Sequence, residues 1–235
     1  PEALFSEHPY NVQPTTDDHP FFFHFFRWTQ TRAVLEQLGK TWQPWGGSGY
    51  FVLVALLGVA LLVSVALIVL PLGFAKRGAI EMKGPKAKVL IYFGLLGIGF
   101  LFVEIPLMQR FILFLGQPIY AFTAVLATLL FFSGLGSLAA AKLSPRSTLP
   151  LLVGVIMLYP LGLPLLFGAV LGAPLAVRLS VTGLSLAPLG FLMGVPFPGG
   201  LEWLRIRAPG LIAWAWAING CASVLASILA AMIAL

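Results

Sequence analysis

A single acidic residue inside a long apolar run is the side chain of this sequence with the clearest capacity for chemistry. Glu104 follows the run IYFGLLGIGFLFV and precedes Ile105 and Pro106, still within apolar sequence. A carboxylate at that depth in a membrane is costly unless it is paired, protonated or turned toward a polar cavity. We therefore expect Glu104 to bind a proton, a cation or an amine ligand, or else to lie in a buried pair that holds helices together.

Three other polar side chains in apolar stretches are the candidate partners of Glu104. Arg110 lies six residues further along, about 240° around a helix, so a direct pair within one straight helix is disfavoured, although Pro106 bends the helix between them. Arg178 is a better partner if its span is a neighbour, and Asn219 can hydrogen-bond between helices. These four residues are the predicted ligand- or ion-binding candidates.

The remaining residues give no second type of site. The three histidines, His8, His19 and His24, all lie in the N-terminal segment with Asp17 and Asp18, but without the spacing of a ligand set. We interpret the aspartates as a turn or cap before FFFHFF. No histidine lies in a predicted span, and the sequence has no nucleotide-binding or hydrolase motif. We therefore predict no catalytic residue, no metal site and no cofactor.

The composition predicts a membrane protein. Hydrophobic residues make up 59% and charged residues 9% of the 235 residues, whereas soluble domains have about 25% charged residues. The net charge of +6 arises from basic residues in short loops between apolar runs, which is typical of membrane topology rather than of a nucleic-acid surface. Because Cys221 is the one cysteine, a disulfide framework is excluded.

The apolar stretches predict an all-α fold, a polytopic transmembrane helix bundle of about six spans. A further apolar block at 111–115 is too short to span a membrane and is expected to extend the second helix. Residues 50–235 form the predicted transmembrane domain. Residues 1–49 are expected to form a polar and aromatic interfacial segment, the tail of a missing soluble domain, and we interpret the chain as a piece of a longer protein. The predicted spans are 50–74, 89–108, 119–140, 149–170, 175–193 and 211–235.

Loop charges and small residues predict the orientation and the packing of the spans. Loops 75–88, 141–149 and 194–210 contain nine of the fourteen lysines and arginines, so we predict that they are cytoplasmic. Gly94 and Gly97 predict a close helix contact. The segment GVPFPGG, residues 194–200, is interpreted as a reverse turn between spans, with the lining of a cavity mouth as the alternative.

An ordered set of motifs resembles a known family. The stretch FVEIPLMQRFILFLGQPIYAFTAVLATLLFFSGLGSLAA, residues 102–140, resembles the membrane part of bacterial spermidine-synthase-like (polyamine aminopropyltransferase-like) fusion proteins. LMGVPFPGG at 192–200 and WAINGCASVLAS at 216–227 are similar to later pieces of that family. PTTDDHPFFFHF at 14–25 resembles the stretch that closes its soluble domain. The resemblance covers most of residues 14–230.

The resemblance implies an integral membrane module of the inner (cytoplasmic) membrane of a bacterium. Such a module anchors a soluble domain and, we expect, binds a small amine or lipid-like ligand near Glu104. Any transfer chemistry would lie in a Rossmann-like domain that is absent here, since the chain has no glycine-rich fingerprint after a strand. Two alternatives remain open: half of a transporter or exporter that uses Glu104 as a proton or cation site, and an accessory structural subunit of a larger membrane complex. The expected partners are the lipid bilayer, the rest of the polypeptide or other membrane subunits, and not nucleic acid.

Overall fold

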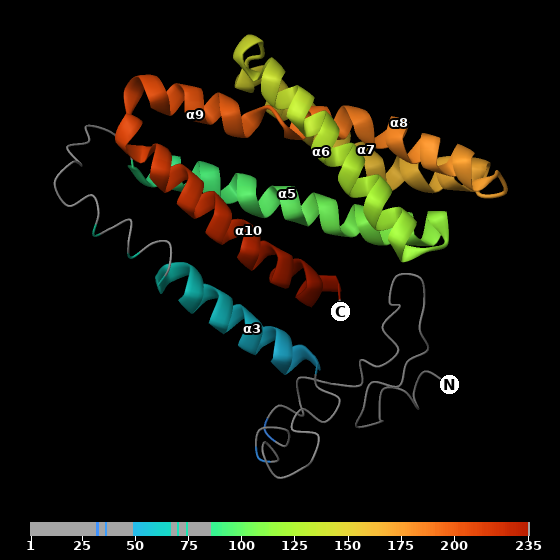
Figure 1. Ribbon diagram of the computed structural model, residues 1–235, viewed down its shortest axis with the longest axis horizontal. Coiled ribbons are helices and arrows are strands. Elements are labelled where there is room, and N and C mark those ends of the chain that lie inside the picture. Colours follow the sequence, from blue (N-terminus) through green and yellow to red (C-terminus); the bar gives the residue numbers. More distant parts are fainter. Residues whose placement is uncertain are drawn as a thin grey trace.

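The part of the chain that the computed structural model describes consists of helices joined by short connections. It comprises residues 32, 36, 49–66, 70, 74 and 86–234, and no strand occurs within it. Figure 1 shows long helices packed side by side. These helices are α3 (Gly49–Ser64), α5 (Lys86–Leu115), α6 (Pro118–Ala139), α7 (Pro145–Val170), α8 (Leu175–Met193), α9 (Pro196–Arg207) and α10 (Ile212–Ala234), with the 3₁₀ turns η3 (Ala140–Lys142) and η4 (Pro209–Leu211).

Five helical stretches are long and apolar enough to cross a membrane, which confirms the predicted multi-pass helical character. The second predicted helix does extend through the block at 111–115, because α5 ends at Leu115. The first of the six predicted spans, at 50–74, contains α3, whose 16 residues are fewer than the roughly 20 that a bilayer requires. Of the predicted interfacial segment at 1–49, nearly all lies outside the described residues. The five stretches are Ala87–Leu115, Pro118–Lys142, Ser147–Val170, Leu175–Arg207 and Pro209–Ile233.

Two helix pairs form the centre of the bundle. Helix α5 packs along α10, and α6 packs along α8, while α5 also contacts α6 and so joins the pairs (Figure 1). Helix α7 lies on α8, and α3 lies on the other side of α10. The partners in each pair run in the same direction. Phe93 and Gly97 of α5 meet Asn219 and Ser223 of α10 in the same order along the chain. Leu129 and Ser133 of α6 likewise meet Gly190 and Gly194 at the end of α8 in the same order.

Two apolar clusters hold these helices together. One lies between α5, α6, α7 and α8 around Phe111, Phe114 and Leu186, and the rings of Phe114 and Phe167 are stacked with centroids 4.3 Å apart. The other joins the start of α5 to α9 and α10 around Phe93. Since the clusters lie at opposite ends of α5, that helix connects both parts of the bundle.

Glycines allow the paired helices to approach closely. A methyl group built on Gly97 would lie 2.5 Å from the carbonyl oxygen of Asn219, and one on Gly94 would lie 3.4 Å from Cγ2 of Ile218. The predicted close contact at these glycines is therefore confirmed, with α10 as the partner. In the α6–α8 pair, a methyl group built on Gly194, at the end of α8, would overlap the backbone of Ser133 on α6. Close approach of this kind is the usual source of packing in membrane helix pairs.

The predicted reverse turn at 194–200 is wrong, and most of the predicted loop 194–210 is helical. Residues 196–207 form α9, which continues the direction of α8 (Figure 1). The reason is that Pro196 begins the helix, where its fixed φ is favourable and its missing N–H has no helical partner to lose. Val195, between the two helices, also has α-helical angles, with φ −81° and ψ −43°. The chain reverses only after Arg207, around η4.

Candidate functional site

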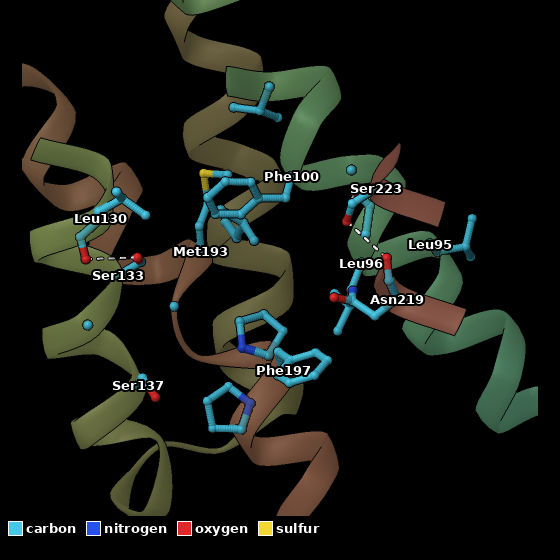
Figure 2. Close-up of a pocket in the computed structure, with 18 of the residues that line it drawn as sticks. Leu95, Leu96, Phe100, Leu130, Ser133, Ser137, Met193, Phe197, Asn219 and Ser223 are labelled. Carbon is cyan, nitrogen blue, oxygen red and sulfur yellow. Dashed lines mark hydrogen bonds between the residues drawn. The ribbon is translucent and has the colours of Figure 1, made fainter. Parts of the chain in front are cut away.

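A pocket opens in the bundle where α8 passes into α9. Its volume is about 530 Å³, and α5, α6, α7, the α8–α9 junction and α10 all contribute to its wall (Figure 2). Apolar side chains form most of the lining, and no described residue in it is charged. The alternative prediction for the segment at 194–200, that it lines a cavity, is thereby confirmed. The apolar lining includes Phe100, Val103, Leu152, Ile156, Met193 and Phe197.

Four polar side chains line this pocket in two pairs. Figure 2 shows Ser133 and Ser137 on α6 at one side, and Asn219 and Ser223 at the other. Both pairs have four-residue spacing, so each pair lies on one face of its helix. The pocket therefore presents polar groups from two walls that are otherwise apolar.

Most of the polar atoms at the pocket are acceptors. Asn219 donates through Nδ2 to the carbonyl oxygen of Phe93 at 3.0 Å, so its Oδ1 is left without a donor among the described residues. Ser223 donates through Oγ to the Asn219 carbonyl oxygen at 2.9 Å, and Ser133 donates to that of Leu130 at 3.1 Å. Since these two hydroxyl protons are in use, Oγ of Ser133 and Oγ of Ser223 can accept but not donate, whereas the Ser137 hydroxyl can do either.

The break between α8 and α9 adds a backbone acceptor. Pro198 has no N–H, so the carbonyl of Gly194, which lines the pocket, receives no hydrogen bond from the residue four positions on. The carbonyl of Leu192 loses its donor at Pro196 in the same way but accepts from the amide of Val195 at 3.3 Å. Irregular backbone at membrane depth is tolerated where it is buried in protein or lines a cavity, and this segment does line one.

Side chains from α5 and α10 hold the break in place. The hydroxyl of Tyr92 donates to the carbonyl oxygen of Pro196 at 2.8 Å. The ring of Phe197 packs edge-on against Phe93 at 5.3 Å and against Trp216 at 4.7 Å between centroids. These contacts fix the start of α9 against the α5–α10 pair, so this wall of the pocket is held by tertiary packing.

Glu104 is buried close to this pocket but does not line it. Its exposed fraction is 8%, and within the described part of the chain its carboxylate has no hydrogen bond and no ion pair. It lies seven residues, about two turns, after Gly97 and therefore on the α5 face that packs against α10. Phe100, which does line the pocket, precedes Glu104 by four residues, which is about 6 Å along the helix axis.

The predicted partners of Glu104 are engaged elsewhere. Arg178 donates through Nη1 to the carbonyl oxygen of Phe114 at 2.9 Å, at the end of α5, where Gly116 has a φ of +79°. Phe114 lies ten residues, about 15 Å, from Glu104 along α5, which is why Arg178 does not pair with the acid. Asn219 is bonded to Phe93, as described above. Arg110 is exposed and lines a different groove, between α5 and α7.

The structure therefore brings together a set of residues that differs from the predicted one. Asn219 is at the pocket, Glu104 is near it, and Arg110 and Arg178 lie toward the far end of α5. Whether these residues bind a ligand stays a prediction. Ser133 and Ser137 were missed, because serines four residues apart fit helix packing equally well. Among the described residues, no three histidine, cysteine, aspartate or glutamate side chains are grouped so as to hold a metal ion.

The helices and the pocket define the class of this protein, a multi-pass helical membrane protein by the length and composition of its helices, with a pocket inside the bundle. No protein-family model, no curated protein and no solved structure matches the chain.

Proposed function

We propose that this chain is the membrane module of a spermidine-synthase-like protein, and that it binds a small amine or lipid-like ligand in the pocket beside Glu104. The observation that carries the proposal is the pocket itself, an apolar space with acceptor groups on two walls. Three of the motifs on which the resemblance is based contribute its polar residues. Residues 102–140 provide Ser133 and Ser137, residues 192–200 provide the helix break, and residues 216–227 provide Asn219 and Ser223.

The chemistry of the pocket favours an amine. An ammonium group carries donors and no acceptor, which complements the free Oδ1 of Asn219 and the free carbonyl of Gly194. The carboxylate of Glu104, about one helical turn beyond the lining residue Phe100, would attract a cation strongly in a medium of low dielectric constant. The apolar wall would pack against the methylene groups of the same ligand.

The placement in the membrane is part of the same proposal. We take the stretch 50–74, which includes α3, as a sixth span of a bacterial inner membrane protein. The predicted loops 75–88 and 141–149 would lie in the cytoplasm, together with the basic end of the predicted loop 194–210, at Arg205 and Arg207. Lys88 at the start of α5, Lys142 after α6 and Arg207 at the end of α9 lie at one end of the bundle, because α5 and α6 run in opposite directions. This end is the basic one, and basic loops favour the cytoplasmic side. The partners would be the rest of the polypeptide or other membrane subunits.

A second candidate function is half of a transporter or exporter. The observation that favours it is the interruption between α8 and α9 at the pocket, because transporter sites are commonly formed by discontinuous helices. In this case Glu104 would be a proton or cation site, and the same ligand would cross the membrane. Flux of labelled spermidine into liposomes that contain the protein separates the two functions, since a binding module gives none.

The proposal is tested by thermal unfolding of the purified protein in detergent with spermidine and related amines. A ligand at about a hundred times its Kd stabilises the folded state by about 2.7 kcal/mol, which corresponds to a rise of several degrees. We expect this rise for the wild type and its loss in Glu104→Gln. We also expect its loss in Ser137→Phe, which fills the pocket, and its retention in the control Leu138→Phe, because Leu138 is 81% exposed and does not line the pocket.

Two results would count against the proposal. If no amine raises the melting temperature of the wild type, the ligand is not an amine, and a structural anchor or a complex subunit is the better account. If Ser137→Phe and Leu138→Phe respond alike, an amine binds, but not in this pocket.

A further inference from the structure

We propose that the groove between α5 and α7 is a binding site for an anionic phospholipid, with one acyl chain in the groove and the headgroup phosphate at Arg110. The groove has a volume of about 450 Å³ and is separate from the pocket at the α8–α9 junction. Its α5 wall runs from Phe102 to Leu113, and its α7 wall includes Pro160 and Pro164.

The α7 wall explains why the groove exists. Pro160 and Pro164 lie inside α7, and each removes a backbone hydrogen bond and bends or loosens the helix around it. The one hydroxyl of the lining, that of Tyr159, donates to the carbonyl oxygen of Ser185 on α8. Between Phe102 and Leu113 the groove therefore offers apolar contacts along its length, which suit a hydrocarbon chain.

The length of the groove matches one leaflet of a bilayer. Phe102 and Leu113 are eleven residues, about 16 Å, apart along α5, and half of the hydrocarbon thickness of a bilayer is about 15 Å. Arg110 lies five residues before the end of α5 at Leu115, so its long side chain can extend to the headgroup level. The groove thus runs from the membrane surface toward the midplane, as an acyl chain does.

The charge of the groove selects the headgroup. Arg110 is exposed and is the one charged side chain among the described residues that line the groove. Arg110 makes an interaction within the chain, and a guanidinium has five N–H donors, more than a single partner takes up. Guanidinium groups bind phosphate with two parallel hydrogen bonds. An amine would be repelled here, so this site and the proposed amine pocket select ligands of opposite charge.

Native mass spectrometry of the protein in detergent tests this inference. The probes are phosphatidylglycerol and phosphatidylcholine with identical acyl chains, each titrated separately. We expect the wild type to hold one phosphatidylglycerol in preference to phosphatidylcholine, and Arg110→Gln to bind phosphatidylglycerol about tenfold more weakly, as the loss of a charged hydrogen bond predicts. Lys142→Gln, which removes one charge at the other end of the bundle, should bind like the wild type.

A second pair of variants tests the acyl site without changing charge. Leu113→Trp places an indole in the groove from an exposed position and should weaken the binding of both lipids, whereas Leu165→Trp, at a position that is 77% exposed and outside the groove, should not. Equal binding by Arg110→Gln and Lys142→Gln, or by the two tryptophan variants, would overturn the proposal. So would equal retention of the two lipids by the wild type.

Discussion

The close contact between α5 and α10 can be tested at one glycine. We expect Gly97→Ala to destabilise the protein, because the new methyl group would lie 2.5 Å from the carbonyl oxygen of Asn219 and 3.0 Å from Oγ of Ser223. Ordinary van der Waals contact begins near 3.4 Å, so the two helices would have to separate by about 0.9 Å at this point. The nearest atom belongs to the backbone of α10, so a side-chain rotation cannot relieve the overlap.

The magnitude follows from what this separation breaks. The hydrogen bond from Ser223 to the Gly97 carbonyl oxygen is already 3.4 Å long, and the bond from Asn219 to the Phe93 carbonyl oxygen is 3.0 Å. Both would pass out of hydrogen-bonding range. Bonds between membrane helices contribute about 0.6 kcal/mol each, and overpacking costs about 1–3 kcal/mol. Alanine favours the helix by about 0.5–1 kcal/mol over glycine, so the net destabilisation is about 1–4 kcal/mol.

The assay is thermal unfolding in one detergent, followed by circular dichroism. Gly99→Ala is the matched control, because Gly99 is on the same helix and nothing lies within 4 Å of its added methyl group. Gly94→Ala meets only the end of the Ile218 side chain, at 3.4 Å, and should fall between the two. We expect Gly99→Ala to have the highest melting temperature of the three variants, Gly94→Ala an intermediate one and Gly97→Ala the lowest. If Gly97→Ala melts with Gly99→Ala, the helices do not approach as described.

Two further predictions concern helix ends and burial. Arg178→Met removes the hydrogen bond to the Phe114 carbonyl oxygen at the end of α5 and should lower the free energy of unfolding by about 1–2 kcal/mol. Arg178→Lys should be less affected. Equal melting temperatures of Arg178→Met and the wild type would show that the bond is unimportant. Cys221 is 7% exposed and its Sγ lies 3.9 Å from the Ser64 carbonyl oxygen, so a bulky maleimide should label the folded protein far more slowly than the protein unfolded in SDS. Rapid labelling of the folded protein would mean that α3 does not cover α10.

The helices could be predicted from the sequence because each crosses an apolar medium. An uninterrupted apolar run has to satisfy its own backbone there, and a helix does so locally. This is why the stretches starting at 89, 119, 149 and 175 agree with α5 to α8. The α8–α9 junction could not be predicted in this way, because prolines that begin a helix and prolines that end one look alike in the sequence. Tertiary contacts to Pro196 and Phe197 decide between them.

The site could be predicted only in part, because its geometry depends on which helices are neighbours. Asn219 was identified because an amide in an apolar run needs a partner, and it has one in Phe93. The partner of Glu104 could not be predicted without knowing which helices are neighbours and in which direction each one runs. Glu104 lies two turns after Gly97 and therefore on the α5 face that packs against α10, while Arg178 meets α5 about 15 Å further along. No spacing in the sequence contains that information.

The two cavities share a wall, and this links the two proposed ligands. Val103 and Ile156 line both the pocket at the α8–α9 junction and the groove between α5 and α7. The pocket has hydrogen-bond acceptors and lies near Glu104, whereas the groove has Arg110 in its lining. The proposed amine would therefore bind poorly in the groove, and the proposed phospholipid would bind poorly in the pocket. The wall between them is formed by side chains of α5 and α7, and α7 is a continuous helix that contains prolines. Prolines are found at both openings: Pro196 and Pro198 of α9 at the pocket, where Pro198 leaves the Gly194 carbonyl as an acceptor, and Pro160 and Pro164 of α7 at the groove.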